Sequence, residues 1–115
     1  MNSNINNIIS KDKIEFYELL ISQMKSVFSE IQTFALKKPD AVVSKFKFKI
    51  IRNLLIDSRE ILKEENSLKY LEFPDEDDLL QNSDIVVLLN QYIAALTDYR
   101  QKFSTRDRFG VWDWN

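Results

Sequence analysis

Residues 40–63, DAVVSKFKFKIIRNLLIDSREILK, are the stretch around which we expect the fold to be organised. On a helical wheel with 100° per residue, four apolar side chains fall within about 40° of Ile50: Val43, Phe46, Leu54 and Ile61. Four more widen this face to about 200°: Phe48, Ile51, Leu55 and Leu62. Because one neighbour cannot cover so wide an arc, the stretch predicts a central helix with at least two packing partners.

Two heptad patterns flank this stretch and predict the other long helices. The first places apolar residues at spacings 3-4-3-4-3: Tyr17, Leu20, Met24, Val27, Ile31 and Phe34. The second repeats the pattern at 4-3-4-3-4: Ile85, Leu89, Tyr92, Leu96, Tyr99 and Phe103. We therefore expect an all-α small helical bundle of three long helices at about 12–37, 40–64 and 83–104, plus one or two short helices in 65–82.

Helix boundaries follow from capping residues and proline. Asp12 with Glu15 has the spacing of a capping box, Asp40 follows Pro39, and Ser83 or Asn82 precedes the last helix. A connection of about three residues predicts an antiparallel hairpin of the first two helices. On the wheel of the central helix we expect Phe46, Ile50 and Leu54 in the core. Ile56 lies among the polar residues.

The composition is that of a single globular domain. The chain has 115 residues, of which 44% are apolar and 30% charged, with one glycine and two prolines. We expect one helical domain over 1–115, with a flexible N-terminus (1–10) and an aromatic C-terminal tail (105–115).

Several reaction chemistries have no candidate residues in this sequence. It contains no histidine and no cysteine, so the commonest general base, metal ligands and disulfides are excluded. No glycine-rich phosphate loop or nucleophile elbow occurs. We expect no enzyme activity, no cofactor, no catalytic residue and no metal.

The N-terminal ten residues lack the basic region and long apolar run of a signal peptide. The most apolar stretch, Ile85–Leu96, is shorter than the ~20 residues that a membrane span needs. We expect a cytoplasmic protein with no membrane contact.

Charge is segmented along the chain. Residues 1–63 carry net +4, residues 64–98 carry net −8 and residues 99–115 carry net +2. The acidic block contains four consecutive acids: Asp75, Glu76, Asp77 and Asp78. Such a run is usually a solvated loop at a helix start, but it can also recognise a basic partner. It lacks the alternating ligands and central glycine of an EF-hand calcium loop. We expect the four side chains to face solvent.

Two other groups of side chains have both a structural and a functional interpretation. Trp112 and Trp114 point the same way in an extended tail, where they either cover an end of the bundle or insert into a partner. A basic group lies on the central helix: Lys45, Lys47, Lys49, Arg52 and Arg59. It is typical of a solvated helix face, and less so of a phosphate-binding stripe. Nucleic acid is not the partner that we expect, since the protein is acidic overall.

The function that these features favour is a non-enzymatic protein–protein interaction module. Its expected partner-binding residues are the acidic run, Asp75, Glu76, Asp77 and Asp78, together with Trp112 and Trp114. One concrete form is an inhibitor or immunity-type protein that binds a basic partner through the acidic segment; in size, acidity and helical pattern the chain resembles bacterial immunity proteins, although no motif carries that resemblance. The alternative is a structural, self-associating homodimer in which the first and third long helices pair. A third interpretation is a weak nucleic-acid binder through the basic helix face.

Overall fold

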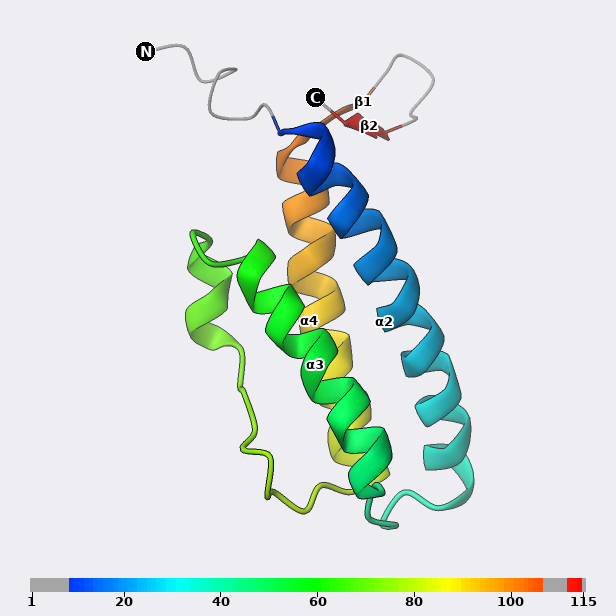
Figure 1. Ribbon diagram of the computed structural model, residues 1–115. Coiled ribbons are helices and arrows are strands. Elements are labelled where there is room, and N and C mark those ends of the chain that lie inside the picture. The colour runs from blue at the N-terminus through cyan, green and yellow to red at the C-terminus, as the bar shows by residue number, and fades with distance from the viewer. Residues whose placement is uncertain (1–8, 107–111, 115) are drawn as a thin grey trace.

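Three α-helices and a short hairpin make up the described part of the chain, which comprises residues 9–106 and 112–114 of the computed structural model (Figure 1). The helical elements in chain order are α2 (Lys11–Lys37), α3 (Lys45–Ile61), the 3-10 helix η1 (Asn66–Tyr70) and α4 (Asn82–Lys102). Strands β1 (Ser104–Arg106) and β2 (Trp112–Trp114) pair antiparallel. The predicted all-α bundle is confirmed, and the hairpin is an addition that the sequence pattern did not indicate.

The directions of the helices explain the long connection after α3. α2 and α3 form the expected antiparallel hairpin, whereas α4 runs in the same direction as α3 (Figure 1). The chain must therefore return along the bundle between the end of α3 and the start of α4. Residues 62–81, which include η1, make this return.

The start of α3 is set by contacts with the start of α4. The backbone N–H of Val43 donates to the carbonyl of Leu80 at 2.9 Å, and the N–H of Asn82 donates to the carbonyl of Ala41 at 2.9 Å. These bonds keep the backbone extended before the helix, so α3 begins at Lys45 and not at the predicted Asp40. The Ser44 hydroxyl caps it by accepting from the N–H of Lys47 at 3.2 Å.

The other two caps also differ from the predicted residues. Ser10, not Asp12, caps α2 by accepting from the N–H of Lys13 at 3.3 Å. Gln81 forms the capping box of α4 with Asp84, whose carboxylate accepts from the N–H of Gln81 at 3.0 Å. The predicted caps, Ser83 or Asn82, both lie inside that helix.

The seams of α2 and α4 are confirmed with few exceptions. Nine of their predicted core residues are buried: Tyr17, Leu20, Met24, Ile31, Ile85, Leu89, Tyr92, Leu96 and Tyr99. Val27 and Phe103 are half-buried, and Phe34 is exposed. The apolar first half of α4 is mostly covered by its neighbours, which leaves Val87 as its exposed member.

The predicted orientation of α3 is wrong by one residue, or about 100° of rotation. Phe46 is 74% exposed and Ile50 is 41% exposed, while Leu54 is half-buried. The buried residues are instead Phe48, Ile51, Leu55, Ser58 and Leu62. Ser58 explains the error, because a wheel counts it as polar although it lies on the buried seam.

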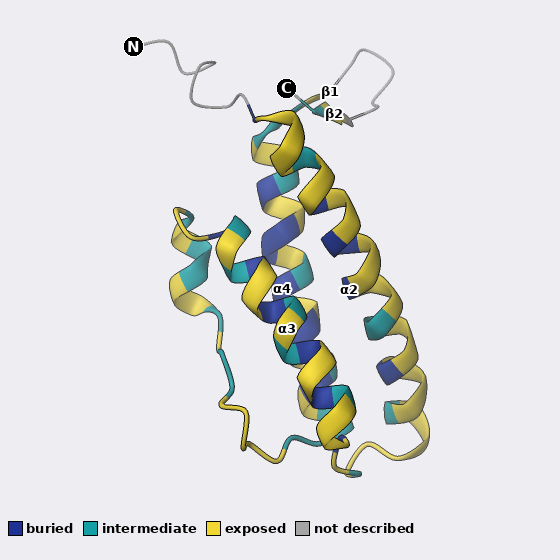
Figure 2. Cartoon of the chain, viewed as in Figure 1, coloured by how far each residue is buried: buried dark blue, intermediate teal, exposed yellow. Residues whose placement is uncertain are grey.

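The burial of Ser58 is possible because its hydroxyl has a partner. It donates to the carbonyl of Leu54 at 2.8 Å, one helical turn earlier, and lies 3.9 Å from the sulfur of Met24. A buried hydroxyl without a partner would oppose folding, whereas this local bond satisfies it. Figure 2 shows the consequence, since the face of α3 towards the viewer is largely exposed.

Candidate functional site

The acidic run lies on the returning segment, whose residues 71–80 we call the strap. The strap is bound to the bundle by α3 and α4. Arg52 Nε of α3 donates to the carbonyl of Pro74 at 3.0 Å, and Arg59 Nη1 donates to the carbonyl of Leu71 at 3.4 Å. From α4, the hydroxyl of Tyr92 donates to the carbonyl of Glu72 at 2.7 Å. Side chains from two helices thus fix the path of the strap.

The two arginines also pack against an aromatic ring. The guanidinium carbons of Arg52 and Arg59 lie 4.5 Å and 5.3 Å from the ring centre of Phe73. Lys47 lies 4.0 Å above the ring of Phe34. The basic face predicted from the sequence is therefore not a solvated stripe throughout, because Arg52 and Arg59 stabilise the strap. This leaves Lys45 and Lys49 as its exposed members.

The Tyr92 hydroxyl joins α3, α4 and the strap, since it also accepts from Arg59 Nη1 at 3.3 Å. Burial raises the pKa of Tyr92, and the nearby Arg59 partly opposes this rise. The phenol is therefore neutral at physiological pH and available to donate.

Replacing Tyr92 by Phe should lower the free energy of unfolding by about 1–3 kcal/mol, because the buried partners of the hydroxyl lose their hydrogen bonds. Amide hydrogen exchange should accelerate in the strap and stay unchanged in α2. Tyr99→Phe is the matched control, as Tyr99 is buried on the same helix and its hydroxyl makes no hydrogen bond within the described residues. Equal effects of the two substitutions on strap exchange would contradict this assignment.

The acidic run forms a turn in the strap. The N–H of Asp78 donates to the carbonyl of Asp75 at 3.1 Å, and the Asp78 carboxylate accepts from the N–H of Asp75 at 2.8 Å. The short helix predicted here is absent, because the backbone N–H groups of Asp75 and Asp78 are already bonded within this turn. All four acids are exposed as predicted, and no ion pair involves them in the part of the chain that the structure describes.

The turn divides the acidic run between two sides of the strap. Glu76 and Asp77 line a hollow of about 330 Å³ that they share with the basic side chains of α3, Lys45, Lys49 and Arg52. Asp75 and Asp78 line a different hollow, between the strap and α4. Only the second pair lies away from compensating positive charge.

This second hollow, which we call the acidic groove, has a volume of about 570 Å³. Its carboxylates come from the strap and from the first turn of α4: Glu72, Asp75, Asp78 and Asp84. Its apolar lining is supplied by the same two elements: Phe73, Pro74, Leu80, Val87 and Leu88. None of the described residues that line it is basic. The groove therefore combines apolar surface with carboxylates that make no ion pair within the described residues.

The acidic groove also contains acids from outside the predicted run. Glu72 and Asp84 are brought to the groove by the strap and the start of α4. Val87, in the apolar first half of α4, is 59% exposed beside the acids, whereas Leu88 is buried. Asp84 directly precedes the apolar run Ile85–Leu89, but the path of the strap could not be read from the sequence.

Trp114 lies at the other end of the bundle. Its ring meets that of Tyr17 edge-on, with centres 5.0 Å apart, and the guanidinium of Arg100 lies 3.8 Å from it. Its indole N–H donates to the carboxylate of Glu18 at 2.6 Å. Of the two alternatives predicted for the tryptophans, Trp114 thus packs on the bundle. The side chain of Trp112 lies outside the described residues. Asp84 and Arg100 are at opposite ends of α4 (Figure 1), so the acidic run and Trp114 do not form one continuous surface.

Tyr17, beneath Trp114, donates its hydroxyl to the carbonyl of Leu96 at 3.0 Å. Burial, together with the nearby Glu18 carboxylate, raises the pKa of Tyr17 to about 12. The folded protein therefore retains this proton above pH 10, where the tyrosine of an unfolded chain loses it.

The Tyr17 contribution to stability should be complete below about pH 10 and should be lost as the pH rises from about 10 to 12, a change of about 2 kcal/mol. Tyr17→Phe should cost about 1 kcal/mol at pH 8, through the missing hydrogen bond. The deficit should shrink or reverse at about pH 11.5, because Phe does not ionise. Urea denaturation of both proteins at the two pH values measures this, and a deficit that is the same at both would contradict it.

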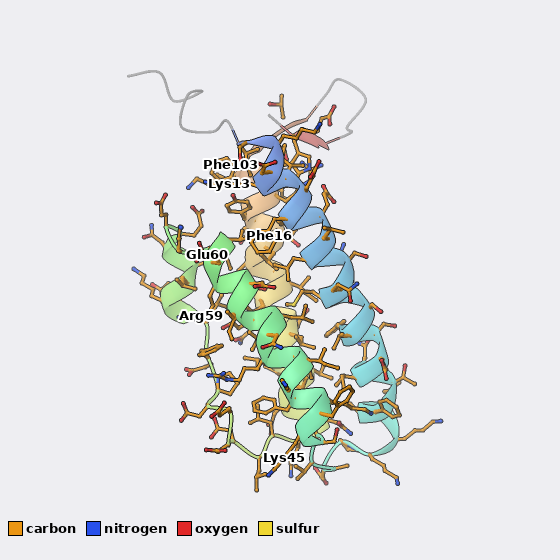
Figure 3. All side chains as sticks on the ribbon, viewed as in Figure 1. Lys13, Phe16, Lys45, Arg59, Glu60 and Phe103 are labelled. Carbon is orange, nitrogen blue, oxygen red and sulfur yellow. The ribbon has the colours of Figure 1, made fainter. Side chains whose placement is uncertain are left out.

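A smaller hollow of about 200 Å³ lies where α2, α3 and α4 meet near the hairpin end. Lys13, Phe16, Glu60 and Phe103 contribute to it (Figure 3). Its charges are largely compensated: Lys63 binds Glu60 at 2.9 Å, which raises the pKa of Lys63, and Lys102 binds Glu65 at 3.2 Å. Its carboxylates are therefore less available to a cationic partner than those of the acidic groove.

Comparison with protein-family models, with curated proteins and with solved structures found no significant match to this chain. Among the residues 9–106 and 112–114, no helix has the length and apolar character to cross a bilayer. Over the same residues, no group of three or more acidic, histidine or cysteine side chains is arranged to hold a metal ion.

Proposed function

We propose that this protein is a non-enzymatic protein–protein interaction module whose acidic groove binds a basic segment of another protein. The observation that supports this proposal is the lining of the groove, with four carboxylates beside exposed apolar surface and no basic side chain among its described residues. A lysine or arginine side chain has a matching chemistry, because its aliphatic stem can pack on Val87 and Phe73 while its charge meets the acids.

An inhibitor or immunity-type protein that neutralises a basic enzyme is one concrete form of this function. We propose the cytoplasm as its location, with which the absence of cysteine is compatible. A role in nucleic-acid binding has less support, since Arg52 and Arg59 are engaged with the strap.

The proposal is tested with a synthetic peptide of alternating lysine and leucine, added to isotope-labelled protein and followed by NMR. We expect shift changes at Val87, Leu88 and the strap that saturate with peptide. A peptide with glutamate in place of lysine is the matched control and should cause none of these changes. Shifts spread evenly over the surface, or confined to the neighbourhood of Trp114, would overturn the proposal.

A further inference from the structure

One face of α3 is largely exposed, although Phe46 and Ile50 border a hollow beside α2 and Asn53 borders a hollow beside the strap. It exposes three large apolar side chains, with Phe46 at 74%, Ile50 at 41% and Ile56 at 44%. Asn53, which is also exposed, lies between them on the same face. None of these residues lines the acidic groove, and the side of α3 that faces the viewer in Figure 2 is largely exposed.

The charges beside this face have opposite signs in the two halves of the helix. The first half carries Lys45 and Lys49, and the second carries Asp57 and Glu60, all of them exposed. Figure 3 marks the two ends with Lys45 and Glu60. Glu60 pairs with Lys63 of its own chain, so Asp57 is the carboxylate left to meet a partner. Lys45 and Lys49 make no ion pair within the described residues, although Glu76 and Asp77 of the strap line the same hollow as these lysines.

We propose that this face binds a second copy of the chain, with the two α3 helices packed antiparallel across a two-fold axis. An antiparallel arrangement places the basic half of each helix beside the acidic half of the other. A parallel arrangement would place lysines beside lysines, which is unfavourable. The helix is thus complementary to itself in one direction only, as a symmetric interface requires.

The same charges determine where the two-fold axis passes. Lys49 and Asp57 each lie four residues from Asn53, about 6 Å along the helix. With the axis at Asn53, Lys49 of one copy comes level with Asp57 of the other. The two asparagine amides then meet, and each can donate and accept a hydrogen bond. An axis closer to Phe46 and Ile50 would bring the lysines of both copies together.

Sedimentation equilibrium of the full chain from micromolar to millimolar concentration tests whether the dimer forms. We expect a concentration-dependent dimer that Phe46→Glu abolishes. Leu19→Glu is the matched control, since Leu19 is 71% exposed on α2, and it should leave the dimer unchanged. A monomer at every concentration, or equal effects of the two substitutions, would overturn the proposal.

Charge reversal tests the orientation. Lys49→Glu and Asp57→Lys should each weaken dimerisation by about tenfold, because two symmetric contacts become repulsive. The double variant should restore dimerisation, because positions 49 and 57 then carry opposite charges again, with their signs exchanged. A double variant no tighter than the single ones would overturn the antiparallel arrangement. None of these substitutions changes a groove residue, so failure here is distinguishable from failure of peptide binding in the acidic groove.

Discussion

Leu55→Ala should lower the free energy of unfolding by about 2–5 kcal/mol, whereas Ile50→Ala should lower it by less than about 1 kcal/mol. Leu55 is fully buried, so its removal leaves a cavity among side chains of all three helices. Ile50 is 41% exposed, and solvent or neighbouring side chains can fill the space it leaves. The small effect at Ile50 differs from the sequence pattern, which placed Ile50 in the core of the bundle.

Urea denaturation monitored by circular dichroism measures both losses. The protein should be kept at a concentration too low for a dimer to form, because Ile50 also lies on the exposed face of α3. Ile56→Ala is a second exposed control and should resemble Ile50→Ala. A larger loss for Ile50→Ala than for Leu55→Ala would mean that α3 is rotated from the orientation described above.

The second large effect concerns the acidic groove. Replacing Glu72, Asp75 and Asp78 by their amides should weaken binding of a basic partner by about tenfold or more. The matched control changes the same charge elsewhere, with Glu76→Gln, Asp77→Asn and Asp98→Asn, and should have a smaller effect. Isothermal titration calorimetry measures the affinities.

Stability should change by less than about 1 kcal/mol in both triple variants, because all six side chains are exposed. The Asp78 side chain accepts a backbone hydrogen bond in the turn, a role that the oxygen of asparagine can fill. A large drop in melting temperature for the groove variant alone would show that its acids hold the strap in place.

The residues of α2 and α4 show what could be predicted from the sequence. Tyr17, Met24 and Leu96 belong to narrow apolar seams, and a narrow seam has one possible inward direction. α3 differs because its apolar residues surround most of the helix. Its orientation was decided by tertiary contacts, which buried Ser58 and left Phe46 exposed.

The candidate site was predictable only in part, for a similar reason. The exposure of Asp75–Asp78 followed from four adjacent acids in a segment with one base. Their division between two hollows did not, because it depends on the strap being bound by Arg52, Arg59 and Tyr92 from distant parts of the chain. The hairpin that places Trp114 against Tyr17 likewise depends on contacts between the two ends of the described chain.

The most direct test of the acidic groove is the association rate of its partner, captured from the native host and identified, at low and at moderate ionic strength. For the unmodified protein the rate should fall steeply as salt is added, because uncompensated carboxylates attract the partner from a distance. The variant with Glu72, Asp75 and Asp78 neutralised should associate slowly at both ionic strengths, while the Glu76, Asp77 and Asp98 control should keep most of the rate and its salt dependence. Association of the groove variant at the unmodified rate would contradict the assignment of the groove as the binding site.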